Sequence, residues 1–169
     1  MSGSNNVEFM KKFVEFINSA SEKLAYELVS PDAIFHVPGR PEPMIGPAGY
    51  LMIIAMMREG FPDVQWTVEE LISEGDKVAA RFTMRGTHRG QFMGVPPTEK
   101  PIAVQALNIY HLTNGQIVKE YASPDMFGLL TQHRSLAGLR TPQWQTKCQL
   151  SAFFDSEQTS RFRPALLPD

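Results

Sequence analysis

The spacing of apolar and polar residues predicts helices in the first third of the chain. From Val7 to Ile17, apolar residues recur at helical spacing with charged residues between them, which is typical of an amphipathic helix. Gly46-Pro47 suits the start of a later helix, since proline is tolerated in a first turn, and Gly60 and Pro62 are expected to end it. The predicted helices are residues 7–17, 22–28 and 46–60.

After Pro62 the alternation of apolar and polar residues typical of strands predominates, following one shorter strand-like run near residue 35. Val104, Ala106, Asn108, Tyr110 and Leu112 alternate with residues of a different character, as in a strand whose two faces meet different surroundings. The predicted strands are residues 33–37, 64–74, 78–85, 101–112 and 116–123. A turn is expected at residues 30–32, and a loop rich in proline at 38–43.

A hairpin joins the last two predicted strands. Asn114-Gly115 lies between them, and both residues tolerate the positive φ that a two-residue hairpin turn needs. Helices followed by a run of antiparallel strands favour an α+β fold over a parallel α/β fold.

Composition narrows the class of protein. The 169 residues are 43% apolar, enough for one domain with a real core, and the formal net charge of −2 includes no basic block. We therefore expect no nucleic-acid partner and no membrane partner. No apolar run has the length of a membrane span and no secretory leader is recognisable, so we expect a soluble, cytoplasmic protein. Cys148 is the single cysteine, which excludes an intramolecular disulfide.

Three motifs resemble a known family. They are Gly86-Thr-His-Arg-Gly-Gln-Phe-Met-Gly-Val-Pro-Pro-Thr98, then Asn114-Gly-Gln-Ile-Val118, and Pro124-Asp125 followed by Gly128-Leu-Leu130. With shorter matches upstream, residues 7 to 133 resemble the SnoaL-like polyketide cyclases. The resemblance implies a cone-shaped α+β fold of the nuclear-transport-factor-two type, in which N-terminal helices cover a curved antiparallel sheet and enclose a pocket. It also implies that Ala122 stands where the polyketide cyclases of the family carry an acid/base Asp.

The resemblance divides the chain into a domain of residues 1–133 and an extension of residues 134–169. The extension contains Trp144 and three phenylalanines among polar residues and prolines. Aromatic residues are scarce in disordered tails, so we expect it to pack on the body or on a partner subunit.

Candidate catalytic residues are polar side chains expected on the pocket face of the sheet. If Ala122 faces the pocket, Glu120 shares its face and could act as the general acid/base; the alternative is a solvent-facing carboxylate beside Lys119. Asn108 could donate a hydrogen bond to a developing oxyanion, or could merely satisfy neighbouring backbone. His36, at the end of a strand, suits proton transfer at a pocket mouth and equally a loop cap.

Seven further residues are candidates for substrate binding, several with a structural alternative. Arg40 could bind a carboxylate or be solvated, His88 could position its loop, and Asp125 could cap a helix. The candidates are Tyr110, Arg40, His88, Asp125, Ala122, Phe82 and Met84.

The sequence contains no motif for phosphate binding, a serine nucleophile or a metal site. No phosphate-binding glycine loop and no Gly-x-Ser-x-Gly elbow occurs, and the four histidines are too scattered for a metal site, so no cofactor and no metal is expected. The leading hypothesis is a cofactor-independent cyclase or isomerase of natural-product metabolism. Its reaction would be acid/base ring closure or skeletal rearrangement of an apolar polycyclic polyketide, terpenoid or alkaloid intermediate.

Two alternatives remain open. Ala122 favours a non-catalytic protein that binds a small molecule in the same pocket. Apolar Leu107 and Ile109, on the face opposite Asn108, favour an accessory dimerisation domain, and we expect a homodimer through this outer sheet face in any case.

Overall fold

The computed structural model of the chain describes residues 3–133, so the predictions for the extension 134–169 and for Cys148 lie outside the described residues. The helices are α1 (Gly3–Ser19), α2 (Glu22–Leu28), α3 (Gly46–Gly60) and α4 (Met126–His133). The strands are β1 (Val29–His36), β2 (Met44–Ile45), β3 (Gln65–Glu74), β4 (Lys77–Thr87), β5 (Pro101–Thr113) and β6 (Gln116–Pro124).

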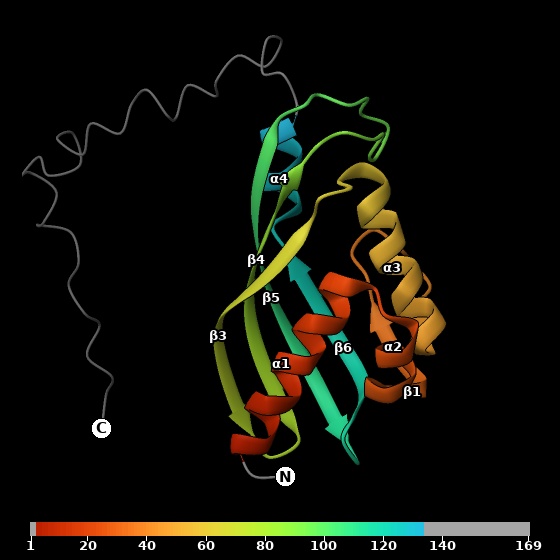
Figure 1. Cartoon of the computed structure of the whole chain (residues 1–169), viewed down its shortest axis with the longest axis vertical. Coiled ribbons are helices and arrows are strands. Elements are labelled where there is room, and N and C mark those ends of the chain that lie inside the picture. The colour runs from red at the N-terminus through yellow and green to blue at the C-terminus, as the bar shows by residue number, and fades with distance from the viewer. Residues whose placement is uncertain (1–2, 134–169) are drawn as a thin grey trace, which may run out of the picture. The chain divides into compact units, whose positions relative to one another are not determined.

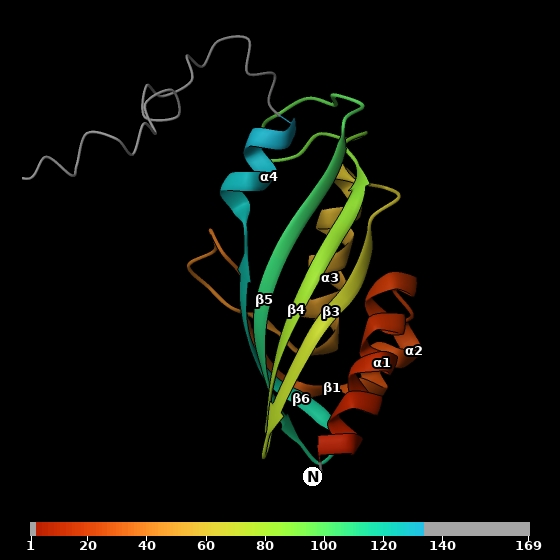
Figure 2. The same ribbon diagram turned by 90° about the vertical axis from the view of Figure 1, so that its left-hand side faces the viewer.

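One curved sheet of six strands forms the body, in the order β2-β1-β6-β5-β4-β3. Helices α1, α2 and α3 lie against one face of this sheet, and the opposite face of β3, β4 and β5 is left uncovered by them (Figures 1 and 2). The predicted α+β architecture of helices over a curved sheet is confirmed.

The sheet departs from the expected antiparallel arrangement at one pair, because β1 runs parallel to β6. No tight turn joins these two strands, which lie far apart in the sequence, so nothing forces them to run in opposite directions. Strand β1 also begins earlier than predicted, at Val29, and its register shifts between Val29 and Ile34. The expected turn at residues 30–32 is therefore an irregular part of a strand, at a proline that cannot donate a ladder hydrogen bond.

The hairpin between β5 and β6 is confirmed. Thr113 pairs with Gln116, and Asn114 and Gly115 have φ angles of 51° and 78°. Both angles lie in the left-handed region that a two-residue turn of this type requires. This turn sets the register that places the residues of β5 beside those of β6.

A bulge in β6 changes which residues face the helices. Leu112 pairs with Ile117 but His111 pairs with Lys119, so Val118 is an extra residue in the strand. Simple alternation along the strand would place Val118 on the same face as Glu120, but the bulge breaks this alternation, and Ile117 is the fully buried neighbour instead.

Strand β3 has a similar bulge. Val68 pairs with Phe82 and Glu70 with Arg81, which leaves Glu69 unpaired. Beyond this point Leu71 packs against the core, whereas Ile72, which unbroken alternation would place on the same face as Val68, is 64% exposed.

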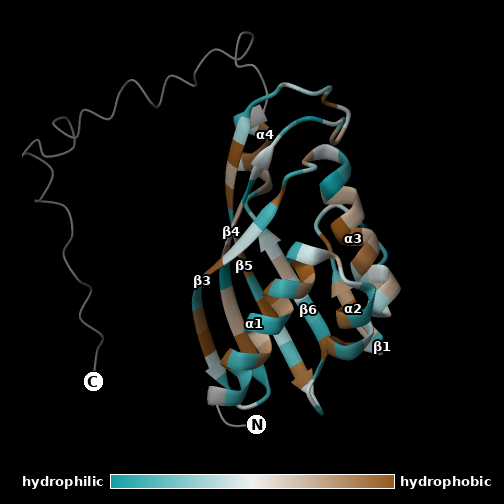
Figure 3. Ribbon diagram, viewed as in Figure 1, coloured by the Kyte–Doolittle hydropathy of each residue, from teal (hydrophilic) through white to brown (hydrophobic). Residues whose placement is uncertain are grey.

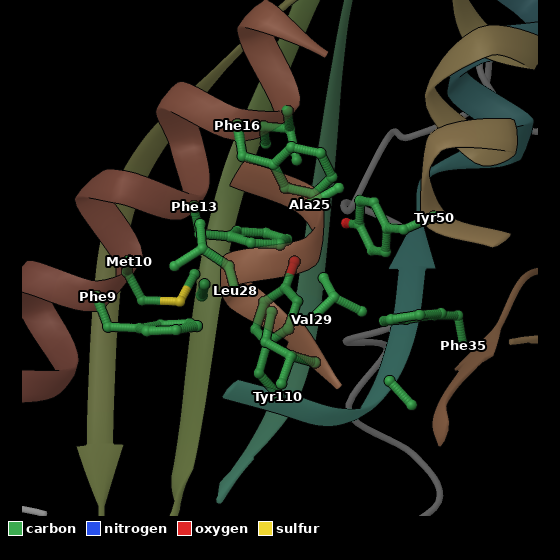
Figure 4. Packing of buried hydrophobic residues seen from close by; sticks show 14 of the residues in the cluster. Phe9, Met10, Phe13, Phe16, Ala25, Leu28, Val29, Phe35, Tyr50 and Tyr110 are labelled. Atoms are coloured by element: carbon green, nitrogen blue, oxygen red, sulfur yellow. The ribbon is translucent and has the colours of Figure 1, made fainter. Parts of the chain in front are cut away.

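The core lies between the helices and the sheet. Phe13 and Phe16 of α1 are fully buried, and the ring of Phe13 packs edge to face on Tyr110 of β5 at 5.1 Å (Figure 4). Burying such a side chain contributes about 1.5–3 kcal/mol to folding. Apolar segments of α3 and of the facing strands continue this core toward α4 (Figure 3).

A polar contact fixes the end of α1 to the edge of the sheet. The amide of Asn18 donates to the Trp66 carbonyl oxygen at 2.9 Å, and its oxygen accepts from the Trp66 backbone N–H at 2.8 Å. The Arg58 guanidinium of α3 also donates to the Asn18 carbonyl oxygen. Helices α1 and α3 are thus tied to one point on β3. Within residues 3–133, no helix combines the length and apolarity needed to cross a membrane.

Candidate active site

A cavity of about 360 Å³ lies between α3 and the concave face of the sheet. Strands β4, β5 and β6 supply its floor, α3 supplies a wall, and residues from the loops after β1 and β4 and from α4 complete it. Most of the lining side chains are apolar. The polar ones therefore mark where chemistry could occur.

Glu120 is the buried carboxyl group of this cavity, with 4% of the residue exposed. The Asn108 amide of β5 donates to Glu120 Oε1 at 2.8 Å and to the Tyr110 hydroxyl oxygen at 3.1 Å. Tyr50, from α3, and Tyr110 also hydrogen-bond to the carboxyl group. Figure 4 shows that the hydroxyl oxygens of the two tyrosines point toward the same space. We call Glu120, Asn108, Tyr50 and Tyr110 the carboxyl cluster.

The environment of Glu120 brings the pKa of its carboxyl group close to neutral pH. Burial raises its pKa from 4.5 to about 7, although hydrogen bonds from Tyr110, Tyr50 and Asn108 to the carboxylate act in the opposite direction. Burial and the nearby Glu120 charge raise the pKa of both tyrosines well above the usual value of 10.0. At neutral pH the phenols therefore remain donors, while Glu120 can both give and take a proton.

A backbone contact orients Asn108. Its side-chain oxygen accepts a hydrogen bond from the Ser123 N–H at 3.2 Å, which turns the NH₂ group toward Glu120 and Tyr110. The amide is thus a fixed double donor.

Eight of the ten residues predicted from sequence line this cavity, and six of them lie together on strands β4, β5 and β6. Glu120, Asn108 and Tyr110 belong to the carboxyl cluster, and Ala122 pairs with Asn108 across the β5–β6 ladder. Phe82 and Met84, on β4, are buried wall residues beside them.

His36 lines the cavity but is not part of the carboxyl cluster. Its ring stacks on Tyr121, with centroids 5.0 Å apart and planes 6° from parallel. Tyr121 alternates with the inward-facing Glu120 and Ala122 and therefore faces the other side of the sheet. The predicted role of His36 in proton transfer at the pocket mouth stays a prediction, since the residue lines the cavity while its ring packs on Tyr121 and not on the carboxyl cluster.

The remaining three candidates lie away from the carboxyl cluster. Arg40 lines the cavity from an exposed loop. His88 is fully buried outside the described lining, where Nδ1 lies 3.0 Å from the Thr98 hydroxyl, so it organises its loop instead of meeting a ligand. Exposed Asp125 accepts from the Gly128 N–H at 2.7 Å and caps α4, which is the structural alternative considered for it.

The sequence reasoning missed Tyr50. Helical spacing places this residue on the apolar side of the predicted helix 46–60, and Tyr50 is indeed buried. A tyrosine on a buried helix face was the available signal, because a buried phenol usually needs a hydrogen-bond partner. That partner is the carboxyl cluster.

Comparison with known proteins places the chain among cyclases. The aklanonic acid methyl ester cyclase DnrD of Streptomyces peucetius is 23% identical over 135 residues, covering 76% of this chain and 90% of the relative. The nogalonic acid methyl ester cyclase of Streptomyces nogalater is 27% identical over 88 residues, covering 52% and 66%. The crystal structure of IdmH from Streptomyces antibioticus superposes with a TM-score of 0.68 at 34% identity, covering 75% of this chain and 96% of IdmH.

The profile of the SnoaL-like polyketide cyclases matches residues 7–133, the same span as the resemblance drawn from the motifs. The predicted family and enzyme class are thereby confirmed. This chain belongs to the SnoaL-like polyketide cyclase family.

Proposed function

We propose that the protein is a cofactor-independent cyclase or isomerase in which Glu120 is the general acid/base. The observation that carries this proposal is the carboxyl cluster: a buried Glu120, with a pKa of about 7, hydrogen-bonded to two phenols and one amide in an apolar cavity. A carboxyl group poised near neutral pH is what proton transfer at carbon requires.

Each member of the carboxyl cluster has a role in this proposal. Ionised Glu120 removes a proton from carbon next to a substrate carbonyl, and the electron pair moves to the carbonyl oxygen. Tyr50 and Tyr110 stay protonated and donate to that oxygen, with Asn108 holding the geometry. The resulting enolate carbon attacks an electrophilic carbon of the same molecule. Glu120 then returns its proton to the oxygen formed at the attacked carbon, so that product and substrate are isomers.

Because position 122 is an alanine, the proposal takes the catalytic carboxyl group from a different position of β6. By resemblance, the acid/base Asp of the family's polyketide cyclases would occupy this position. Glu120 lies two residues earlier on the same face of β6 and lines the same cavity. The longer side chain thus supplies a carboxyl group from a neighbouring position, and the Ala122 methyl group leaves space for the substrate.

The relatives bear on the substrate class. Two of those named above are cyclases of aklanonic acid methyl ester and of nogalonic acid methyl ester. Together with the family membership, they favour a polyketide over a terpenoid or an alkaloid as the substrate of this protein.

The test compares metabolites of the source organism with those of a strain that lacks this gene, by mass spectrometry. The compound that accumulates should have the mass of the lost product, and purified protein should convert it without added cofactor. Glu120→Gln should lower turnover by roughly 10²-fold or more, which is the usual size of general acid/base catalysis. Exposed Glu15 provides the matched control, since Glu15→Gln makes the same chemical change outside the cavity. Equal turnover by the two variants would remove Glu120 from the mechanism.

A second candidate function is non-catalytic binding of an apolar metabolite. It is favoured by Ala122, which lacks any group for proton transfer. Tight binding of the accumulated compound without conversion would support binding over catalysis.

We also propose a homodimer through the outer sheet face. Ile72, Ala79, Ile109 and Tyr121 pair successively across four strands, and Ile72, Ile109 and Tyr121 are 64%, 42% and 44% exposed. Leu107, 54% exposed, lies on the same face. A second copy offers an identical apolar row, so both rows could be removed from water together.

A further inference from the structure

Two of the four members of the carboxyl cluster are phenols that come from different elements. Tyr50 lies on α3 and Tyr110 on β5, and 7% and 1% of these residues are exposed. Each phenol hydrogen-bonds to Glu120, and Tyr110 also hydrogen-bonds to Tyr50. The hydroxyl of a tyrosine lies at the far end of its ring, so a small tilt of the ring moves the hydroxyl out of line. Whatever fixes the two rings therefore fixes the two donors.

The ring of Phe13, on α1, packs on both phenols. Its centroid lies 5.5 Å from that of Tyr50 and 5.1 Å from that of Tyr110, and the ring planes are inclined by 73° and 65°. Both contacts are edge to face, an arrangement that aromatic pairs prefer at centroid distances of about 4.5–7 Å. Figure 4 shows the Phe13 ring close to both tyrosines. Phe13 thus joins α1 to α3 and to β5 at the point where the two donors lie.

Each phenol has further ring contacts, but these contacts are not shared between the two phenols. They are Phe16 with Tyr50, Phe35 with Tyr50 and Phe82 with Tyr110. Loss of one of these contacts would loosen one phenol and leave the other held. Loss of the Phe13 ring would loosen both phenols at once.

Phe13 has no direct contact with the space that a substrate would fill. It is fully buried, its side chain has no polar atom, and it is not among the described residues that line the cavity. A substrate in the cavity therefore meets the phenols and not Phe13. Removal of the Phe13 ring would leave the described lining in place while the two hydroxyls lose a common support.

We infer that Phe13 is a positioning residue: its ring holds the hydroxyls of Tyr50 and Tyr110 in the geometry from which both donate within the carboxyl cluster and to a substrate oxygen. This inference rests on the proposed function for the reaction itself. A misplacement of about 1 Å can lower a rate by roughly 10²-fold, even when the changed residue lies away from the reacting atoms. Phe13→Leu keeps an apolar side chain in the core but removes the ring from both contacts.

Turnover of the compound that accumulates in the strain lacking this gene gives the first readout. Phe13→Leu should lower kcat by about tenfold or more and leave KM within about twofold, because the donors are misplaced while the lining is kept. Phe9→Leu is the matched control, since Phe9 lies one turn earlier on α1, is 8% exposed and belongs to the same core cluster. The ring contacts described for the two tyrosines do not include Phe9. Both variants are assayed at a temperature at which circular dichroism shows them folded.

The titration of Glu120 gives a second readout that needs no substrate. Burial raises the pKa of Glu120, and hydrogen bonds from Tyr110 and Tyr50 act against this rise. Loosened rings should therefore move the titration of Glu120 to higher pH in Phe13→Leu and leave it in place in Phe9→Leu. The measurement is NMR of protein labelled with carbon-13 at the glutamate side-chain carboxyl, and Glu120→Gln identifies the signal. Phe13→Met, whose flexible side chain fills the space without a ring, replaces Phe13→Leu if that variant does not fold.

The two readouts together separate positioning from packing. Equal losses of kcat in Phe13→Leu and Phe9→Leu would indicate packing alone and overturn the inference. A raised KM with unchanged kcat would also overturn it, as would a titration of Glu120 that is the same in both variants. Failure of Glu120→Gln to lower turnover would overturn the proposed function instead, while the titration of Glu120 in Phe13→Leu would still test the ring contacts, so the two failures are distinguishable.

Discussion

The raised pKa of Glu120 makes the stability of the fold depend on pH in a defined direction. The pKa rises from 4.5 to about 7 in the folded state, so between these values the folded protein holds a proton that the unfolded chain has released. Stability therefore falls as pH rises through this window. A change of about 2.5 units corresponds to about 3 kcal/mol at ~1.4 kcal/mol per unit.

Glu120→Gln removes this titration while keeping the size of the side chain. The amide oxygen can still accept from the phenols, and no charge has to be buried at high pH. We expect the variant to gain stability relative to the natural protein between pH 4.5 and pH 8, by about 3 kcal/mol in all. For a chain of this length that is roughly 6–12 °C in Tm.

The assay is thermal unfolding followed by circular dichroism at half-unit pH steps. The quantity of interest is the Tm of Glu120→Gln minus that of the natural protein, because contributions that the two proteins share cancel in this difference. Glu15→Gln makes the same chemical change at an exposed position of α1 and is the matched control. A difference for Glu120→Gln that is constant from pH 4.5 to pH 8 would refute the reasoning, since Glu120 would then titrate alike in the folded and unfolded states.

Four other changes have expected outcomes. Asn108→Leu removes a donor to the carboxylate, so the pKa of Glu120 should rise further; because the proposed reaction starts with ionised Glu120, the rise of activity on the acidic side of the pH–rate profile should move to higher pH, and an unchanged profile would contradict this. Gly90→Ala places a methyl group onto a backbone carbonyl of α3 and should lower the free energy of unfolding by about 1–3 kcal/mol in urea titrations. Asp125→Ala should cost about 1 kcal/mol by loss of the helix cap and leave turnover unchanged, whereas a catalytic Asp125 would show the reverse. Leu107→Glu should convert the proposed dimer to a monomer in sedimentation velocity with the cavity intact, and a natural protein that sediments as a monomer would refute the dimer itself.

Much of the fold was predictable because local signals agreed with the global arrangement. The Asn114-Gly115 turn, the alternation in β5 and the Gly46-Pro47 start of α3 each needed only neighbouring residues. The parallel β1–β6 pair depends on residues far apart in sequence and has no such local signal. The bulges at Glu69 and Val118 were not visible either, because an extra residue in a ladder is defined by the partner strand.

The residues that face the cavity could be predicted where the alternation of side chains along a strand is unbroken. Glu120 faces the cavity because it lies two residues from Ala122 with no bulge between them. His36 lines the cavity at the end of β1, but its ring partner Tyr121 could not be predicted, because it is set by the register of β1 with β6, which the residues around His36 do not reveal. Tyr50 was missed because helical spacing identifies a buried face but not what a hydroxyl on that face will meet.

The residues that line the cavity rest on different kinds of scaffold. The carboxyl cluster is carried by β5, β6 and α3, whereas Arg40 and Met93 lie in connecting loops. The loop after β4 is held at its base by N–H groups of Arg89 and Gly90, which donate to the Gly60 carbonyl oxygen at 3.0 Å. Insertions or deletions beyond that anchor would alter this part of the lining while leaving the proton-transfer geometry in place. Homologues could in this way differ in substrate range through their loops alone. A designer could likewise replace these loops without changing the carboxyl cluster.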